Sequence, residues 1–305
     1  MDRVLADRVA VVTGATRGAG RAIAVELGAR GATVFVTGRS TAGRRSPMDR
    51  PETIEQTAEL VAAAGGRGIP VRCDFTEPAD VDGLVATIES TVDGRLDVLV
   101  NDVWGGDPFV EHDKPFWAAD LTGALRVLDN GVHSHLIALH KLAPLLVRRG
   151  SGLLVEITDG DTEDYFGTAL PYYLVKSTVR RIGQAMAKQL APHGITALTV
   201  TPGFLRSEAM LAGFGVTEGN WRDGIAEDPH FAMSETPHYL GRAVAALAAD
   251  PSADRFAGRT MASWTLMREY GFTDTDGSQP DWGRWFDDVV QRDVDPTTVD
   301  AQRYR

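Results

Sequence analysis

Short apolar segments alternate with longer amphipathic ones through most of the 305-residue chain, and this rhythm restricts the fold more than any other feature. Several of the short segments are unbroken apolar runs, which is typical of strands buried on both faces. We predict strands at 8–13, 33–37, 69–73, 96–100, 152–158 and 195–200, and a seventh near 258–263. The predicted helices lie near 18–30, 52–64, 78–92, 125–149, 171–191 and 237–249. The pattern predicts a single α/β domain, doubly wound, with a parallel sheet of about seven strands flanked by helices.

Charge and composition exclude several classes of partner. The formal net charge of −11 argues against a nucleic acid or an anionic membrane as partner, so we expect a small-molecule substrate. Cys73 is the only cysteine, so no intramolecular disulfide can form. We find no signal peptide and no apolar stretch of the ~18 residues that span a membrane, and therefore expect a cytoplasmic protein.

Two segments interrupt the alternation of strands and helices. Residues 203–235 form a long insertion after the sixth predicted strand, which we interpret as a substrate lid. Residues 271–305 form a polar tail that contains aromatic side chains. We expect residues 1–270 to form the domain and the tail to pack on it or on a partner subunit.

A glycine-rich turn follows the first predicted strand and precedes the first predicted helix. Such a turn lets the backbone approach a diphosphate, which the N–H groups and dipole of the helix N-terminus then bind. The position between a strand and a helix favours this function over a purely structural turn. The residues predicted to contact a ligand that carries such a diphosphate are Gly14, Thr16, Arg17, Gly18, Ala19 and Gly20.

The pattern TGxxxGxG at 13–20 resembles the cofactor motif of the short-chain dehydrogenase/reductase family, and the similarity continues to about residue 270. The resemblance implies a Rossmann-type fold and a nicotinamide cofactor. It also implies hydride transfer between a carbonyl and an alcohol.

An arginine ends the second predicted strand, where NAD-binding sites carry an acidic residue. Arg39 suits the 2′-phosphate of NADP(H) through its charge and its fork of donors, and Arg17 lies in the glycine-rich loop where NADP-dependent relatives carry a basic residue. We therefore predict NADP(H) as the cofactor. Arg44 and Arg45 could close over the phosphate, or could be solvated like Arg50.

The resemblance implies further cofactor contacts. They are Asp74, Phe75, Asn101, Pro202, Gly203 and Phe204, with Ser207 assisting at the carboxamide. The sequence NDVWGG stands where the family has NNAG, so Asp102 and Trp104 replace small or neutral residues beside the cofactor.

Tyr172 and Lys176 are four residues apart on a predicted helix and therefore share a face. They match the YxxxK of the family. An unperturbed phenol has a pKa of about 10, and a nearby ammonium favours the phenolate. Tyr172 is thus predicted to be the general acid and base, assisted by Lys176, which in the family also binds the nicotinamide ribose.

Asp159 occupies the position, thirteen before the tyrosine, where the family has a serine that donates to the substrate oxygen. An ionised carboxylate cannot donate and would oppose charge that develops on a carbonyl oxygen. Thr158 could supply the hydroxyl instead, or a protonated Asp159 could donate. Asp159 could also bind a cationic centre, which favours an imine or amine substrate, or could simply cap the loop.

The family's fourth catalytic residue, an asparagine that supports a water relay to the lysine, is also replaced. The spacing places Gly131 there, with Asn130 adjacent. These departures and the segment GVHSHL resemble a divergent branch of the family. His133, His135 and His140 lie in the same helix without a metal-ligand pattern, so we predict core or interface histidines and no metal.

Three functions remain open from the sequence. The leading one is an NADP(H)-dependent carbonyl reductase or alcohol dehydrogenase. The others are an imine reductase or amine dehydrogenase that uses Asp159, and an NADPH-binding sensor without catalysis. Aromatic residues predicted near the pocket or on the lid are Trp104, Phe109, Tyr165, Phe166, Phe204, Phe214 and Trp221. The helices 125–149 and 171–191 pair subunits in the family, which implies a homodimer or homotetramer.

Overall fold

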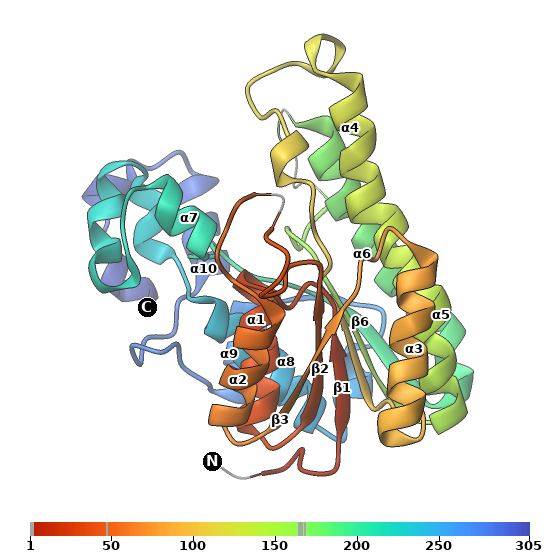
Figure 1. Cartoon of the computed structure of the whole chain (residues 1–305). Helices are drawn as coiled ribbons and strands as arrows, with labels where there is room; N and C mark the ends of the chain where they lie inside the picture. The colour runs from red at the N-terminus through yellow and green to blue at the C-terminus, as the bar shows by residue number, and fades with distance from the viewer. Residues whose placement is uncertain (1–2, 47, 164–166, 168) are drawn as a thin grey trace.

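Seven strands form one parallel sheet in the part of the chain that the structure describes, residues 3–46, 48–163, 167 and 169–305 of a computed structural model (Figure 1). The strands are β1 (Val9–Val12), β2 (Thr33–Gly38), β3 (Arg67–Arg72), β4 (Val98–Asn101), β5 (Gly152–Ile157), β6 (Ile195–Thr201) and β7 (Thr260–Ala262). Their order is β3-β2-β1-β4-β5-β6-β7. The order reverses between β1 and β4, as in a doubly wound Rossmann-type sheet, which confirms the predicted fold class.

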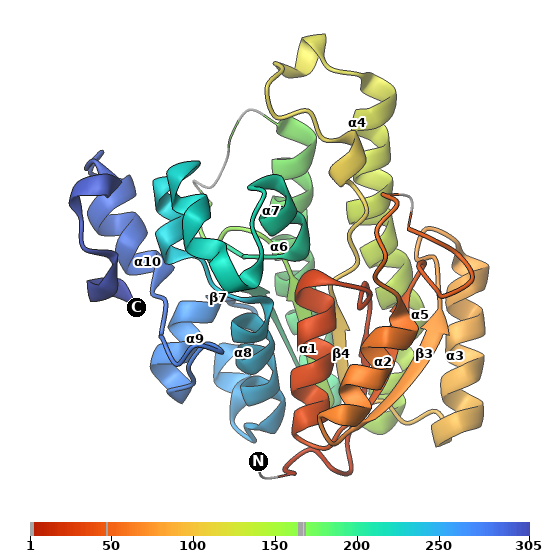
Figure 2. The ribbon, with the colours of Figure 1, turned by 60° about the vertical axis from the view of Figure 1, so that its left-hand side comes forward.

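Side chains alternate between two cores along the central strands. Ala10 and Val12 of β1 face one cluster, whereas Val9 and Val11 face the other. The first cluster is covered by α1 (Gly18–Ala29), α2 (Ile54–Ala63) and α8 (Pro237–Ala249), and the second by α3 (Pro78–Val92), α5 (Ser134–Arg149) and α6 (Leu170–Leu190). Figure 2 shows α1, α2 and α8 on one side of the sheet and α3 with α5 on the other. Burial of both faces explains the unbroken apolar runs.

The helix predicted at 125–149 is longer and less regular than expected. It begins as α4 (Leu121–Leu128), because the Asp120 side chain accepts hydrogen bonds from the first-turn N–H groups of Thr122 and Gly123. A π-helical turn, Asp129–His133, then connects α4 to α5. Such turns are frequent at functional sites, and this one contains Gly131.

The insertion at 203–235 folds as a small unit over the carboxyl edge of the sheet. It contains α7 (Glu208–Gly213) and the 3₁₀ segments Glu218–Ala226 and Pro229–Met233. Its two ends are joined, because the N–H of Arg206 donates to Glu235 O at 2.8 Å and the N–H of Glu235 donates to Phe204 O at 2.9 Å.

The tail continues from α9 (Ser263–Tyr270) through α10 (Trp282–Trp285) and packs on this insertion. Met233 of the insertion and Trp285, Val289 and Tyr304 of the tail form a separate buried cluster. The Arg305 side chain is buried and donates to the carbonyl oxygens of Ala232 and Ser234. Figure 1 shows the tail and α7 together on one side of the carboxyl edge, opposite α4.

Candidate active site

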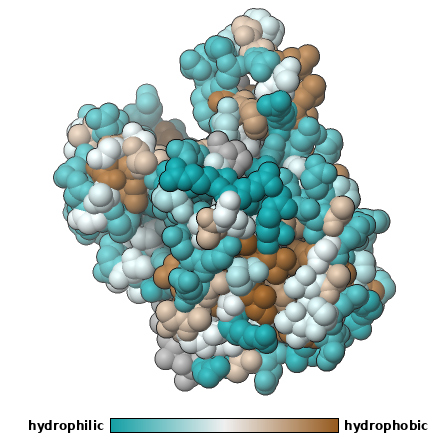
Figure 3. Space-filling view, in the orientation of Figure 1, coloured by the Kyte–Doolittle hydropathy of each residue, from teal (hydrophilic) through white to brown (hydrophobic). Residues whose placement is uncertain are grey.

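A cleft of about 2340 Å³ opens at the carboxyl edge of the sheet. Figure 3 shows the molecule hollowed between the side formed by the insertion and tail and the side formed by α4. Fifteen of the seventeen residues predicted to be catalytic or cofactor-binding line this cleft; only Gly20 and Asn101 do not. The lining residues are Gly14, Thr16, Arg17, Gly18, Ala19, Arg39, Asp74, Phe75, Thr158, Asp159, Tyr172, Lys176, Pro202, Gly203 and Phe204.

The glycine-rich turn holds its backbone against the turn after β4. Gly14 has a φ of +66°, and a Cβ there would lie 2.5 Å from the carbonyl oxygen of Asp102, so only glycine fits. The first N–H of α1, at Gly18, donates to the Glu208 carboxylate of α7 at 2.9 Å. An acidic side chain therefore occupies the anion-binding end of this helix.

The two arginines predicted at the cofactor both face the cleft. Arg17 donates through Nη2 to Ser46 Oγ at 3.3 Å, while its buried Nη1 has no hydrogen-bond acceptor among the described residues. Burial lowers the pKa of Arg17 from its usual value. Arg39 Nη1 lies 3.8 Å from a carboxylate oxygen of Asp74. A buried donor without an acceptor fits an anionic ligand group.

Arg45 and Arg50, in the loop after Arg39, are each paired with a carboxylate. Arg45 pairs with Asp49 at 2.5 Å and its side chain is 72% exposed. Arg50 pairs with Glu52 at 2.9 Å. Neither points an unpaired guanidinium at the cleft, so we assign them no ligand.

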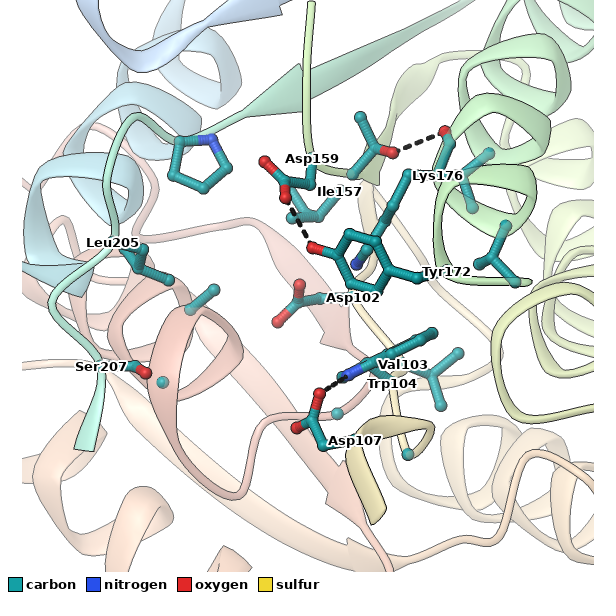
Figure 4. Close-up of a pocket in the computed structure, with 18 of the residues that line it drawn as sticks. Asp102, Val103, Trp104, Asp107, Ile157, Asp159, Tyr172, Lys176, Leu205 and Ser207 are labelled. Carbon is teal, nitrogen blue, oxygen red and sulfur yellow. Dashed lines mark hydrogen bonds between the residues drawn. The ribbon is translucent and has the colours of Figure 1, made fainter. Parts of the chain in front are cut away.

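Tyr172, Lys176 and Asp159 meet in the middle of the cleft (Figure 4). The hydroxyl of Tyr172 donates to Oδ2 of Asp159 at 2.5 Å. Lys176 Nζ lies 5.3 Å from the centre of the Tyr172 ring. The tyrosine and lysine lie one turn apart on α6 and the aspartate follows β5, so the parallel sheet brings the three together.

Thr158 has its hydroxyl directed elsewhere. The side chain is buried, and Oγ1 donates to the backbone carbonyl of Lys176 at 2.8 Å. This bond ties the end of β5 to α6. The hydroxyl proton is therefore engaged away from the position where Asp159 meets Tyr172.

Asn101 lies behind the cleft in a buried polar network. Its Nδ2 donates to Glu156 Oε1 at 3.0 Å, and its Oδ1 accepts from Thr13 Oγ1 at 3.0 Å. His135 contacts Glu156 Oε2 through Nδ1 at 2.6 Å and donates through Nε2 to Val103 O at 3.0 Å. The network fixes the turn that carries Asp102 and Trp104. His135 is thus a core histidine, whereas His133 and His140 are exposed.

Asp102 brings a second carboxyl group to the cleft. Burial raises its pKa to about 7, opposed by the charge of Lys176 and by a hydrogen bond from the backbone N–H of Gly20. Figure 4 shows the Asp102, Asp159 and Tyr172 side chains directed toward the same space. Gly20 itself packs inside the turn, where a Cβ would lie 2.8 Å from the Asp102 carboxyl.

Aromatic side chains surround the far end of the cleft. Phe204 packs edge-on against Trp282 with ring centres 5.8 Å apart. The insertion and tail supply much of this lining, with Met210, Phe214, His230, Trp282, Phe286 and Val290. Tyr165 and Phe166 lie outside the described residues.

Three residues that line the cleft, Glu208, Trp282 and Phe286, were not predicted from the sequence. Glu208 follows the predicted Ser207, which caps α7 through its hydroxyl, but nothing in its spacing indicated the contact with Gly18. Trp282 and Phe286 belong to a tail whose aromatic content was visible but whose position was not. Asn130 lines the cleft, yet its amide donates to Arg126 O.

The described residues contain no group of three His, Cys, Asp or Glu side chains placed to hold a metal ion. In the same residues, no helix is both long and apolar enough to cross a lipid bilayer.

Comparison with known proteins agrees with this geometry. Residues 8–213 match the model of the short chain dehydrogenase family, to which this chain belongs. The mouse protein named dehydrogenase/reductase SDR family member 1 is 33% identical over 275 residues, which cover 88% of this chain and 84% of the relative. Its human counterpart is 30% identical over 279 residues with the same coverage. A crystal structure of a putative short-chain dehydrogenase/reductase from Burkholderia xenovorans superposes with a TM-score of 0.70 at 24% identity, covering 86% of this chain and 96% of that one. The chain is therefore an oxidoreductase of a family that binds NAD(P) and acts on small molecules.

Proposed function

We propose that this protein is an NADP(H)-dependent oxidoreductase that interconverts a carbonyl and an alcohol, with Tyr172 as the general acid and base. The observation that carries the proposal is the meeting of Tyr172, Lys176 and Asp159 in the cleft that the glycine-rich turn also lines. A phenol next to an ammonium is the arrangement that moves a proton to or from a carbonyl oxygen.

The residues around the cleft fit a dinucleotide phosphate. The glycine-rich turn lines the cleft at the N-terminus of α1, the end of a helix that binds a diphosphate. The buried Nη1 of Arg17, with no acceptor among the described residues, and the guanidinium of Arg39 suit a 2′-phosphate. These contacts support NADP(H) over NAD(H).

The chain's own residues handle the proton. Bound NADPH supplies the hydride. In reduction, the Tyr172 hydroxyl leaves Asp159 and donates to the carbonyl oxygen, and Lys176 stabilises the phenolate that remains. In oxidation Tyr172 accepts the proton of the alcohol. The aromatic side chains of the insertion and tail would enclose an apolar substrate and exclude water.

The position of Asp159 supports a second candidate, reduction of imines or oxidation of amines. Its carboxylate stands at the chain position of the family's serine hydroxyl, and it accepts a hydrogen bond from the Tyr172 hydroxyl with 2.5 Å between the oxygens. A negative charge there favours an iminium carbon–nitrogen bond over a developing alkoxide.

Turnover by the purified protein separates these functions. NADPH is mixed with ketones, aldehydes, quinones and cyclic imines, and Tyr172→Phe is compared with Tyr173→Phe, whose ring lies next to Tyr172 but outside the cleft lining. Carbonyl turnover that falls at least ~100-fold in Tyr172→Phe and stays high in Tyr173→Phe supports the leading function. Turnover of imines alone favours the second candidate. Tight NADPH binding without any turnover would instead leave a sensor.

Exposed leucines support self-association as a homodimer or homotetramer. They lie on α4, α5 and α6, the helices that pair subunits in the family: Leu121, Leu125, Leu136, Leu170 and Leu174. Light scattering on the purified protein tests this, and a mass of one chain at micromolar concentration would contradict it.

A further inference from the structure

The indole of Trp104 sits in a space that two glycines leave open. A Cβ on Gly106 would lie 2.5 Å from Cη2 of the indole, and a Cβ on Gly131 would lie 2.8 Å from Cζ3. Both distances are too short for any side chain without movement of the ring. The indole, together with Val175, whose Cγ1 would lie 2.5 Å from the same Cβ, therefore fills the place where the family's asparagine would project from position 131.

The ring is fixed at its edge as well as at its faces. Its Nε1–H donates to Oδ1 of Asp107 at 2.5 Å (Figure 4). It packs against a buried cluster that includes Val127, Val175 and Val179. A side chain held in this way has little freedom to rotate, so what it touches is held in turn.

Trp104 touches both members of the proposed proton-transfer pair. Lys176 Nζ lies over the indole, 4.4 Å from the ring centre, closer than the 5.3 Å that separates it from the Tyr172 ring. Tyr172 meets the same indole edge-on, with ring centres 5.8 Å apart and an interplanar angle of 86°. A cation over an indole face is held by the ring quadrupole, and perpendicular aromatic pairs also attract.

We propose that Trp104 is a positioning residue that holds Lys176 and Tyr172 in the arrangement needed for proton transfer. Its indole packs against Gly131, the position where the family spacing places an asparagine. The inference rests on the proposed function, because it assigns the pair a role in proton transfer. In the family, an asparagine and its bound water support the lysine ammonium. Here the indole face of Trp104 takes that role, and the packing around Gly131 leaves no room for an asparagine side chain.

A substitution series distinguishes positioning from simple packing. Trp104→Phe keeps an aromatic face, whereas Trp104→Leu keeps bulk without one. Trp117→Leu is the matched control, because its indole is 89% exposed. We expect kcat to fall about 10-fold in Trp104→Leu with little change in KM or NADPH affinity, and to recover to within about 3-fold of wild type in Trp104→Phe. Equal loss in both variants, or none in Trp104→Leu, would overturn the proposal.

A second measurement does not depend on a known substrate. Tyrosinate absorbance of the NADPH complex is titrated with pH, and the Tyr172 component is assigned by subtracting the Tyr172→Phe titration. The charged and titratable groups that face this pair are unchanged by the substitutions; they are Asp102, Asp159, His112 and Tyr173. Loss of the cation's support shifts the midpoint upward by about half a unit to one unit in Trp104→Leu, and not in Trp117→Leu.

The two measurements can refute the positioning role and the proposed function independently of each other. If the wild-type protein turns over no substrate while the midpoint still shifts, the proposed function fails and the positioning of the pair stands. If turnover is present but the midpoint and kcat of Trp104→Leu match wild type, the positioning role is overturned and the proposed function stands.

Discussion

The phenol oxygen of Tyr172 lies 2.5 Å from Oδ2 of Asp159, so the proton that the tyrosine would give to a substrate is directed at a carboxylate. In the family's usual arrangement a neutral hydroxyl stands at that position and donates to the same substrate oxygen as the tyrosine. Here the partner competes for the proton. If the proposed function holds, we expect the balance between carbonyl and imine chemistry to depend on the residue at 159.

Asp159→Ser is expected to raise kcat/KM for ketone and aldehyde reduction by about 10- to 100-fold, because it removes a negative charge and restores a donor. The same substitution should lower any turnover of cationic imines. Steady-state oxidation of NADPH measures both. Asp159→Asn serves as the isosteric comparison, since it removes charge without supplying a hydroxyl.

Thr158 provides the counter-test. Because its hydroxyl donates to Lys176 O, Thr158→Val should affect stability more than the choice of substrate. A larger loss of carbonyl reduction in Thr158→Val than in Asp159→Asn would move the donor role to the threonine.

Arg39→Ala is expected to weaken NADPH binding about 10- to 100-fold and to leave NADH binding nearly unchanged. The reason is that a charge-assisted bond to a phosphate is worth about 1.5–3 kcal/mol. Arg17→Ala should act in the same direction. Fluorescence titration of both cofactors measures the effect, with the exposed Arg45→Ala as control. Equal losses for NADPH and NADH would contradict a 2′-phosphate site.

Glu208→Gln is expected to tighten NADPH binding about 3- to 10-fold. The Glu208 carboxylate accepts the N–H of Gly18, which a bound diphosphate would need, and it places a negative charge beside that diphosphate. Glu227→Gln makes the same charge change at an exposed position of the insertion and should have little effect. Equal affinity in Glu208→Gln and wild type would mean that the carboxylate does not compete.

The raised pKa of the buried Glu235 carboxyl makes the free energy of unfolding depend on pH. Burial raises its pKa to about 8, above the ordinary value of about 4.3, so the folded state binds the extra proton between these values. The contribution of Glu235 protonation to the free energy of unfolding is fully present below about pH 4. It is lost as the pH rises to about 8. Between about pH 5 and pH 8 the loss is on the order of 2–4 kcal/mol.

Glu235→Gln keeps the acceptor for Gly203 N–H and Ser263 Oγ and removes the titration. Its unfolding free energy, measured in urea at several pH values, should therefore decline less steeply than that of wild type. Asp102 has a pKa raised to about 7 and adds a slope of the same sign, which Asp102→Asn would remove. Parallel pH profiles for wild type and Glu235→Gln would show that Glu235 titrates normally.

Most of the fold followed from local patterns. The double-faced burial of β1, β4 and β5 appears in the sequence as continuous apolar runs, and their boundaries were predicted to within a few residues. The helix at 125–149 was misjudged because its start depends on the Asp120 cap, and its π turn depends on packing around Gly131.

Only part of the candidate site could be predicted from the sequence. The positions of Tyr172, Lys176 and Arg39 follow from spacing along single elements, which a sequence displays directly. Other contacts join segments that are far apart in the chain. They are the packing of Trp104 against Gly131, the hydrogen bond between Gly18 and Glu208, and the position of Trp282 in the cleft lining. No periodicity connects such segments, because the sheet brings them together only after folding.

The insertion and tail share the small buried cluster of Met233, Trp285, Val289 and Tyr304, separate from the two clusters that cover the sheet. A separate core of this size makes a local cooperative unit whose opening costs less free energy than global unfolding. In hydrogen exchange, amides of the insertion and tail would lose protection together while those of β1 and β4 stay protected. We therefore expect access to the aromatic end of the cleft to be governed by one concerted opening of insertion and tail that leaves the sheet folded.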